Sequence, residues 1–435
     1  MDYYVGFSDD WFSHDEVTVI KMGKVAVIGL GLTGKSAIDY LKGSGESVIA
    51  LDTRASPSGV DELQVKYPDM PIHLGSLDAL LTESVDSLVI SPGVSLDEPV
   101  LCRMREKQIP IFSDIDLFLK KNTAPVIAIT GSNGKTTVTT WVGECLKALG
   151  YRVNVCGNIG IPVLSRIEEE VDFVVMELSS FQLDASHDIQ AEIAVCLNIS
   201  PDHLDRHGSL ENYTAAKMHI YRGAKIAIVN NEQAGYQYRG VAGQRVVPIL
   251  ELPDESGKSR LHRVNAAAVV TILVAAGISK MDAIRVIGQC RGLPHRFESV
   301  GSVNGVTYIN DSKATNVGAA ISAMQAAKDQ AKKVILIAGG QTKSAPLDEW
   351  ATVVKESVAS VFLYGADALL MELALQKVGK NSVLVRDLKE AVEKAYKEAQ
   401  FGDIVLLAPA AASLDMFSSY EQRGDVFAQC VSSLR

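Results

Sequence analysis

A glycine-rich segment that ends in lysine and threonine carries the most specific chemistry in this chain. It reads Gly131-Ser132-Asn133-Gly134-Lys135-Thr136-Thr137 and directly follows the apolar run 126–130. Glycines let backbone N–H groups turn toward phosphate oxygens, and the positive end of a following helix attracts the same anions. Lys135 can place a charge near the outer phosphates, and Thr136 can ligate magnesium. The pattern favours a polyphosphate site over an ordinary turn, although Ile129 stands where the full phosphate-loop spacing has a glycine.

An acid and a histidine follow other apolar runs. Glu177 comes after residues 171–176, and His203 stands in Asp202-His203-Leu204-Asp205 after residues 193–199. Phosphate-loop proteins place an acid at such a strand end to bind magnesium directly or through water. For Glu177 we favour this metal role over a solvated carboxylate. For His203 a structural role is the commoner alternative to a metal ligand.

Lys217 stands four residues after Tyr213, so the two side chains would share one face of a helix. The ordinary interpretation is a solvated lysine. An ammonium group would repel magnesium, so Lys217 could join a metal site only as an anion, for instance as the carbamate formed with carbon dioxide. The spacing leaves both alternatives open.

A second glycine pattern lies near the start of the chain. Gly29-Leu30-Gly31-Leu32-Thr33-Gly34 ends the apolar run 25–29, and Asp52 follows the next run at 47–51. Strand, glycine turn and a later acid are typical of dinucleotide-binding folds, so this part alone would fit an NAD(P) site. Because a second phosphate site lies downstream, we favour a nucleotide-bearing substrate here over a redox cofactor.

Two further short segments combine cations, acids and amides. They are Gly292-Leu293-Pro294-His295-Arg296-Phe297-Glu298 and Asn310-Asp311-Ser312-Lys313-Ala314-Thr315-Asn316. Such side chains could clamp an anion, or they could belong to structural turns with charged surfaces. Each segment alone leaves both alternatives open.

Composition excludes several classes of protein. A net charge of -10 and a pI near 5.4 argue against broad binding to nucleic acid or an anionic membrane. Six cysteines without a Cys-x-x-Cys pair suit a reducing compartment and speak against a zinc module. No apolar run reaches the roughly 18 residues of a membrane span, and the first twenty residues are acidic. We therefore expect a cytoplasmic protein, and separately we expect a monomer. We treat residues 1–21 as an extra segment because Met22 could be an alternative start.

Apolar runs and helical patterns alternate almost throughout the 435-residue chain, which predicts an α/β protein with three domains. We expect a Rossmann-like domain at 1–113, a central phosphate-loop ATPase-like domain with a mostly parallel sheet at 114–292, and a Rossmann-like domain at 293–435. The polar stretch 114–125 would lead into the second domain. Beyond the runs already named, we expect strands at 85–90, 334–338, 361–364 and 404–407, and helices at 35–43, 265–277, 280–289 and 387–400.

Taken together, these motifs resemble the ATP-dependent Mur ligases of peptidoglycan synthesis, over all three expected domains. The segments that carry the likeness are 131–137, 177–183, 202–206, 292–298 and 311–316. The ending, with Ala412-Ser413-Leu414-Asp415-Met416-Phe417 and Glu421-Gln422-Arg423-Gly424, most resembles the D-glutamate-adding branch. A Mur ligase for another amino acid or a folylpolyglutamate synthase is the nearest alternative, and this ending argues against both. A regulatory nucleotide switch is disfavoured because no Asn-Lys-x-Asp signature is present.

The resemblance implies an enzyme that couples ATP cleavage to joining D-glutamate to UDP-N-acetylmuramoyl-L-alanine, through an acyl phosphate and a tetrahedral intermediate. It implies two Mg²⁺ ions, for which Mn²⁺ could substitute. It assigns catalysis to Lys135, Glu177, His203 and Lys217, and metal binding to Thr136, Glu177, His203 and the carbamate of Lys217.

The remaining residues implied by the resemblance fall into three sets. The ATP set is Gly131, Ser132, Asn133, Gly134, Lys135, Thr136, Thr137, Asn265, Arg296 and Asp311. The set for the UDP-bearing substrate is Leu32, Thr33, Asp52, Thr53, Arg54, Ser91 and Asn158. The D-glutamate set is Lys313, Thr315, Lys343, Ser413, Leu414 and Tyr420.

Two places depart from the family pattern. The run Leu261-His262-Arg263-Val264-Asn265 keeps only the last asparagine of His-Asn-x-x-Asn, so the adenine contact of the family carries over at Asn265 alone. Gln341 and Pro346-Leu347 replace an acid and Asp-Phe, which puts details around Lys343 in doubt but not the reaction.

Overall fold

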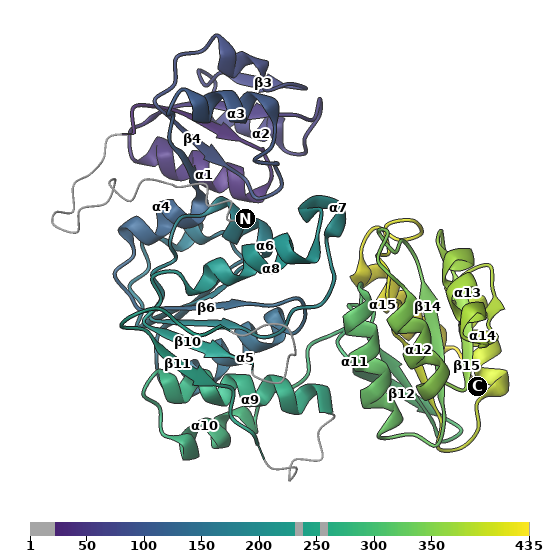
Figure 1. Ribbon diagram of the computed structural model, residues 1–435. Helices are drawn as coiled ribbons and strands as arrows, with labels where there is room; N and C mark the ends of the chain where they lie inside the picture. The colour runs from purple at the N-terminus through teal and green to yellow at the C-terminus, as the bar shows by residue number, and fades with distance from the viewer. Residues whose placement is uncertain (1–21, 231–237, 253–259, 435) are drawn as a thin grey trace. The chain divides into compact units, whose positions relative to one another are not determined.

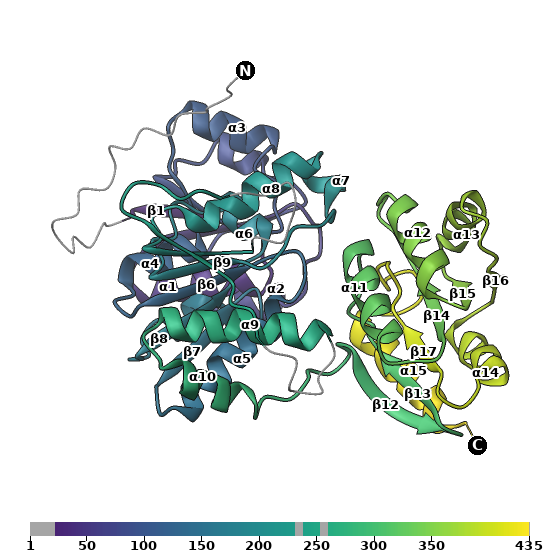
Figure 2. The ribbon, with the colours of Figure 1, turned by 60° about the horizontal axis from the view of Figure 1, so that its bottom comes forward.

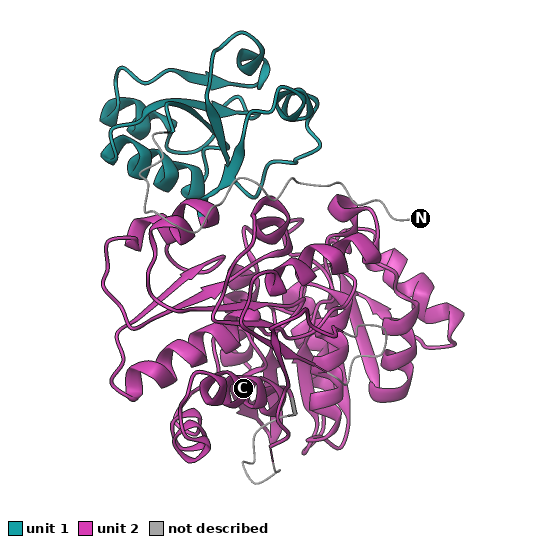
Figure 3. Cartoon of the chain, turned by 60° about the vertical axis from the view of Figure 1, so that its left-hand side comes forward, with its two compact units in different colours: residues 1–114 teal, residues 115–435 magenta. Residues whose placement is uncertain are grey.

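The computed structural model describes residues 22–230, 238–252 and 260–434. The chain separates into two compact units, Met1–Asp114 and Ile115–Arg435 (Figure 3). The expected α/β class is confirmed, because three sheets are present and all but one strand pair in them is parallel. The expected extra segment 1–21 lies outside the described residues. Along the described ranges no helix combines the length and the apolar character that crossing a membrane requires.

Unit 1 is built on a parallel sheet in the order β3-β2-β1-β4-β5. Its elements are β1 (Lys24–Ile28), α1 (Leu32–Gly43), β2 (Ser47–Asp52), α2 (Val60–Lys66), β3 (Ile72–Leu74), η2 (Asp78–Leu81), β4 (Ser87–Ile90), α3 (Pro99–Glu106) and β5 (Ile111–Ser113). In β1, Val25 through Ile28 are fully buried. Strands of a parallel sheet that are covered on both faces read as unbroken apolar runs, which is why the sequence predicted β1, β2 and β4.

The first sheet of unit 2 is entirely parallel, in the order β11-β10-β9-β6-β8-β7. Its strands are β6 (Val126–Thr130), β7 (Val153–Gly157), β8 (Phe173–Glu177), β9 (Ile193–Cys196), β10 (Ile226–Val229) and β11 (Arg245–Pro248). The helices α5 (Lys135–Ala148), α9 (Arg260–Ala275) and α10 (Lys280–Ile287) share one apolar cluster with it, while α6 (Ser180–Ala185), α7 (Leu204–His207) and α8 (Leu210–Met218) lie on the other side (Figure 1). The short helices are η3 (Val163–Arg166) and η4 (His219–Tyr221).

The stretch 114–125, which we expected to lead into the second domain, begins with a helix, α4 (Asp114–Lys121). Ile115, Leu117 and Phe118 are buried there, at 0, 4 and 2% exposure. Apolar residues interleaved with charged ones at helical spacing give one buried face, which the count of polar residues alone concealed.

The second sheet of unit 2 runs β12-β13-β17-β14-β15-β16, and only the β12–β13 pair is antiparallel. Its strands are β12 (Glu298–Val303), β13 (Val306–Asn310), β14 (Val334–Gly339), β15 (Ser360–Tyr364), β16 (Val383–Leu384) and β17 (Ile404–Leu407). Helices α11 (Val317–Lys328), α12 (Asp348–Ser357) and α13 (Ala368–Lys377) cover one face, and α14 (Leu388–Glu398) and α15 (Tyr420–Ser432) cover the other (Figure 2). Alternate residues of β14 enter the two opposite clusters, so the whole strand is apolar.

The order in which the chain adds strands to this sheet reverses between β14 and β17. The chain leaves β14 toward β15 and returns through β17 on the other side, so the loops after these two strands diverge at the carboxyl edge. Gly340, with φ of 129°, brings them together, because a Cβ there would lie 2.1 Å from the carbonyl oxygen of Ala412. Gln341 and Ala412 exchange backbone hydrogen bonds of 2.9 and 2.8 Å. Ligands of open α/β sheets bind at such places.

Candidate active site

The phosphate loop connects β6 to α5, as its sequence predicts. Gly131 and Gly134 adopt φ values of 150° and 82°, which other residues rarely adopt. Lys135 begins α5 and folds over the loop, where its Nζ donates to the carbonyl oxygens of Gly131 at 2.7 Å and Ser132 at 3.1 Å. Burial lowers the pKa of Lys135, while the negative charges of Glu177 and Asp202 act in the opposite direction.

The segment after β9 holds this loop in shape. The N–H of Ser132 donates to the carbonyl oxygen of Asn198 at 2.9 Å, and the N–H of Asn133 donates to the side-chain Oδ1 of Asn198 at 2.8 Å. The Ser132 hydroxyl donates to the carbonyl oxygen of Ser200 at 3.0 Å and lies 3.0 Å from the Tyr213 hydroxyl. Sequence reasoning missed Asn198 and Ser200, because no spacing links them to a loop more than 60 residues earlier.

Glu177 ends β8 at the same sheet edge as the phosphate loop. It is only 1% exposed, so the alternative of a solvated carboxylate is wrong. Its Oε1 accepts a hydrogen bond from Asn158 Nδ2 at 2.9 Å, and its Oε2 is buried without a partner among the described residues. A carboxylate oxygen left with free lone pairs in a buried position fits a cation ligand. A capping box, in which Ser179 and Gln182 bond each other's backbone N–H, then starts α6 directly after this acid.

His203 lies in a tight turn with φ of 53°, and its Nε2 is 3.7 Å from Asp202 Oδ2. The ring of Phe181 meets it edge-on with 4.9 Å between centroids, and His207 stacks on the same phenyl ring at 5.2 Å. Burial lowers the pKa of His203, against the charge of Asp202. The neutral imidazole that results is the form able to ligate a metal ion.

Lys217 is buried at 1% exposure in α8, so the alternative of a solvated lysine is wrong. Its Nζ donates to the Gly131 carbonyl oxygen at 3.0 Å and lies 3.4 Å from Thr130 Oγ1 and 4.8 Å from the centroid of the Tyr213 ring. Burial, assisted by the charge of Lys135, lowers the pKa of Lys217 to about 7. A substantial neutral fraction exists near neutral pH, and the neutral amine is the form that reacts with carbon dioxide.

Among the described residues, no three His, Cys, Asp or Glu side chains gather in a way that would hold a metal ion. A metal here would therefore draw ligands of other types, such as the hydroxyl of Thr136, phosphate oxygens or a carbamate on Lys217. The oxygen of Glu177 that has no partner in the described part of the chain is the observation that favours such a site.

The second sheet of unit 2 adds charged groups to this region. Asp311 follows β13 and is 6% exposed, and burial raises its pKa to about 7. Lys313 Nζ lies 4.0 Å from the centroid of the Tyr420 ring. Burial, assisted by the charges of Arg296 and Lys135, lowers the pKa of Lys313 to about 8. These cations are close enough to influence one another, which suits an anionic ligand.

The remaining predicted contacts of this sheet lie in its carboxyl-edge loops. Ser413 is buried at 3% exposure, whereas its neighbour Leu414 is 67% exposed. Thr315 lies in the loop before α11, and its N–H donates to the Lys313 carbonyl oxygen at 2.7 Å. Lys343 adopts φ of 53°, and its charge reaches His203, whose pKa it lowers.

Sequence reasoning gave no separate role to Arg423, which is fully buried. Its guanidinium group donates to the Ser312 hydroxyl at 2.9 Å, to the Ser312 carbonyl oxygen at 2.8 Å and to the Ala411 carbonyl oxygen at 3.1 Å. It thereby ties the loop after β13 to the loop after β17. The only sequence signal was its place in Glu421-Gln422-Arg423-Gly424.

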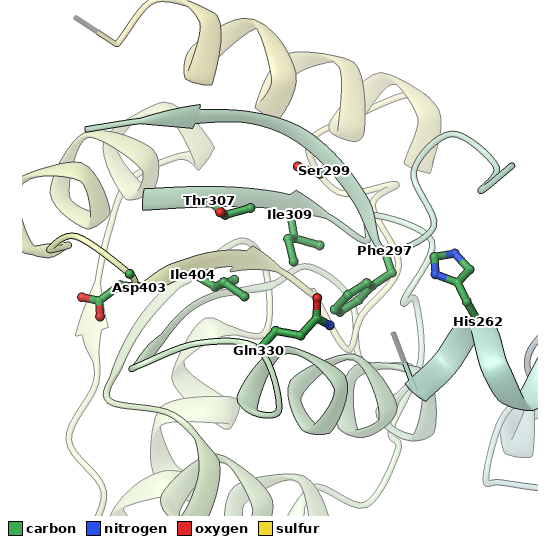
Figure 4. A pocket seen from close by; sticks show the side chains of 9 residues that line it. His262, Phe297, Ser299, Thr307, Ile309, Gln330, Asp403 and Ile404 are labelled. Atoms are coloured by element: carbon green, nitrogen blue, oxygen red, sulfur yellow. The ribbon is translucent and has the colours of Figure 1, made fainter. Parts of the chain in front are cut away.

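His262 and Asn265, from the run 261–265 in α9, contact different parts of the molecule. The Oδ1 of Asn265 faces the phosphate loop, since a Cβ on Gly134 would lie 2.7 Å from it. The ring of His262 lies against Trp141, with 5.8 Å between centroids. His262 also lines a cavity of about 420 Å³ together with Phe297, Ile309 and Gln330 (Figure 4).

In unit 1 the glycine turn is held by the acid that sequence analysis singled out. Asp52 is 2% exposed; its Oδ2 accepts from the Leu30 N–H at 2.7 Å, and Arg54 donates to both oxygens at 2.7 to 2.9 Å. The Ser91 hydroxyl donates to the Gly29 carbonyl oxygen at 2.7 Å, while Leu32 is 76% exposed. An acid that binds the ribose of NAD needs free oxygens, so this arrangement disfavours the redox alternative. The contacts with a uridine nucleotide stay a prediction.

Three family models match successive parts of the chain. The Mur ligase MurD-like N-terminal domain matches residues 23–113, the Mur ligase middle domain matches 129–289, and the Mur ligase glutamate ligase domain matches 295–411.

Two relatives carry the name UDP-N-acetylmuramoylalanine–D-glutamate ligase. The protein from Legionella pneumophila (strain Paris) is 42% identical over 94% of this chain and 98% of its own length. The protein from Marinobacter nauticus is 40% identical over 96% of this chain and 99% of its own length. A solved MurF ligase from Thermotoga maritima shares the fold, with a TM-score of 0.58 and 15% identity over 88% of this chain and 95% of its own. The chain therefore belongs to the Mur ligase family.

Proposed function

We propose that the protein joins D-glutamate to UDP-N-acetylmuramoyl-L-alanine at the expense of ATP, in the cytoplasmic stage of peptidoglycan synthesis, and that it acts as a monomer. Residues 1–113 bind the uridine nucleotide, residues 114–292 bind ATP, and residues 293–435 bind D-glutamate. The proposal is supported by two nearly full-length relatives that carry this enzyme's name.

The single observation that carries the reaction type is the convergence of two lysine side chains on the loop that begins at Gly131. The Nζ atoms of Lys135 and Lys217 donate to its carbonyl oxygen at 2.7 and 3.0 Å. Two positive charges so close together would raise the free energy of the free protein, so burial and the charge of Lys135 favour the neutral amine of Lys217. Lys135 is then the cation that meets an incoming polyphosphate, and Lys217 is left able to form the carbamate.

The first step activates an acid. The carboxylate of the UDP-bearing substrate attacks the γ-phosphorus of ATP; an O–P bond forms, the bond to ADP breaks, and an acyl phosphate results. Lys135 and the loop N–H groups offset charge on the phosphoryl oxygens. Thr136, Glu177, His203 and a carbamate on Lys217 would hold the Mg²⁺ ions, which supply Lewis acidity to these oxygens.

The second step forms the amide. The amine of D-glutamate attacks the acyl carbon, and the tetrahedral intermediate expels phosphate. Lys313, Thr315, Lys343, Ser413, Leu414 and Tyr420 form the proposed pocket that orients this amine. Because water would hydrolyse the acyl phosphate, the pocket must exclude it while both substrates are bound.

The test is ADP release measured with UDP-N-acetylmuramoyl-L-alanine and a panel of amino acids. We expect release only when D-glutamate is also present, and none from Lys135→Ala. Comparable turnover with L-lysine, meso-diaminopimelate or L-alanine would refute the assignment. An absorbance change of a reduced nicotinamide cofactor would instead favour the redox alternative.

A further inference from the structure

The side chain of Asn316 uses all of its polar groups in hydrogen bonds. Its partners lie in α11, in the phosphate loop and in the segment after β9. Its Oδ1 accepts from the N–H of Ala319 at 2.9 Å and so caps α11. Its Nδ2 donates to Asn133 Oδ1 at 3.1 Å and to Asp202 Oδ2 at 3.0 Å. The amide is 7% exposed, and its two N–H groups and its oxygen are all used. Capping by the oxygen thereby fixes which way the N–H groups point.

A second observation marks the same contact. A Cβ on Gly318 would lie 2.5 Å from Ser200 Oγ and 2.7 Å from Ser200 Cβ, so only glycine allows this approach. Ser200 accepts a hydrogen bond from Asn133 Nδ2 at 3.2 Å and bonds Ser132 through its backbone. The first turn of α11 therefore rests on the residues that shape the phosphate loop.

Asn316 directly follows the loop that supplies Asp311, Lys313 and Thr315. From these contacts we propose that Asn316 is a positioning residue, which sets the distance between the amino-acid loop and the phosphate loop so that the attacking amine meets the acyl phosphate. The inference rests on the proposed function. It gives Asn316 a role in the reaction, which the resemblance to the family does not assign to this residue.

The sharpest variant is Asn316→Asp. A carboxylate still accepts from the Ala319 N–H, and a negative charge near a helix N-terminus is favourable, so the cap is kept. The two donors are lost, and the new charge faces the Asp202 carboxylate. We expect kcat for amide formation to fall about 10- to 100-fold, as small misplacements of reacting groups do. ATP cleavage should fall less, so that the ADP released per amide formed rises above the wild-type ratio.

That ratio separates positioning from a merely structural role. A loss of folded protein lowers ADP release and amide formation equally and leaves the ratio unchanged. The KM for ATP should change little in Gly318→Ala, which adds no charge beside the phosphate loop. Gly318→Ala tests the same contact without altering the cap or any charge, and it should also raise the ratio.

Matched controls are available in the chain. Asp387→Asn exchanges the same two residue types at the cap of α14, and Gly43→Ala fills open space at the end of α1. Neither residue lies in the proposed site, and both variants should keep the wild-type ratio. In the double variant Asn316→Asp with Asp202→Asn the donor and acceptor are exchanged. Compared with the two single variants in a cycle, it should recover about tenfold in amide formation.

D-glutamate-dependent ADP release by the wild type is measured first. A failure of the proposed function can then be told apart from a failure of the positioning role of Asn316. If wild type shows no D-glutamate-dependent ADP release, the proposed function is wrong. If wild type is coupled but Asn316→Asp and Gly318→Ala both keep its ratio and kcat, Asn316 does not position the amine. An equal fall of both activities with an unchanged ratio also overturns the proposal.

Discussion

Glu177 presents its two carboxylate oxygens to different surroundings. Oε1 accepts a hydrogen bond from Asn158 Nδ2 at 2.9 Å, and Oε2 is buried with no partner among the described residues. Asn158 therefore fixes the rotation of the carboxylate and leaves one oxygen directed away from protein donors. An unsatisfied buried oxygen is costly, which is understandable where a ligand later satisfies it.

Replacing this acid tests the metal role. In Glu177→Gln the Asn158 bond can persist, but an amide N–H₂ replaces the free oxygen and repels a cation. We expect Mg²⁺-dependent ADP release to fall at least about 100-fold, because loss of a charge that stabilises the transition state costs several kcal/mol. The melting temperature should change little. Glu192→Gln, which alters a carboxylate paired with Lys225, should keep wild-type activity. Wild-type Mg²⁺ dependence in Glu177→Gln would contradict the assignment.

Lys217 should form a carbamate in a pH-dependent way. Its pKa of about 7 means that the neutral amine is about a tenth of the total at pH 6 and about nine tenths at pH 8. Addition of carbon dioxide gives R–NH–COO⁻ and releases a proton. With dissolved ¹³CO₂ held constant, the ¹³C carbamate signal should therefore grow from pH 6 to pH 8 and be absent in Lys217→Met. A signal that survives in Lys217→Met would assign the carbamate elsewhere.

Asp52 should make the stability of the protein depend on acid. Burial raises its pKa, but hydrogen bonds from Arg54 and Leu30 outweigh burial and lower it to about 2, from 3.8. The contribution is thus complete at about pH 5 and above, begins to fall as the pH approaches the unfolded value of 3.8, and is lost as the pH falls through about 2. We expect it to reach about 2 kcal/mol at neutral pH. In chemical unfolding, the gap between wild type and Asp52→Asn should narrow between pH 5 and pH 3.

Arg423 should stabilise the loops that carry the proposed amino-acid pocket. Arg423→Met leaves the carbonyl oxygens of Ser312 and Ala411 buried without these donors, at about 1–3 kcal/mol each. We expect the free energy of unfolding to fall by about 3 kcal/mol or more and the KM for D-glutamate to rise. Arg386→Met removes an exposed guanidinium at the start of the same sheet's α14 region and should do neither. Unchanged stability in Arg423→Met would show that water replaces the lost donors.

Much of the fold followed from local patterns. Runs such as 334–338 and 404–407 became β14 and β17 because a strand covered on both faces is apolar throughout. The sequence did not predict the short strands β3, β5 and β16. Each has two or three partly exposed residues at a sheet edge, so it forms no unbroken apolar run. Helix α4 was not predicted, because its apolar residues form one face only when the sequence is read at a period of 3.6 residues.

Cysteines show the same limit. The sequence scatters them without a paired motif, yet Cys145 and Cys290 place their sulfur atoms 3.6 Å apart. Helix α5 and the segment after α10 meet in one core, and spacing along the chain says nothing of such contacts.

The sequence by itself determined the phosphate loop, its lysine and the acid after β8, because strand, glycines and helix follow one another directly and need no distant partner. Only the tertiary structure decided that Lys217 is buried with its pKa near 7, that Glu177 has one oxygen without a partner among the described residues, and that Asn316 meets Asn133 across 183 residues. Burial and the charges that surround a group depend on segments far apart in the chain, so these properties exist only once the sheets and helices have packed.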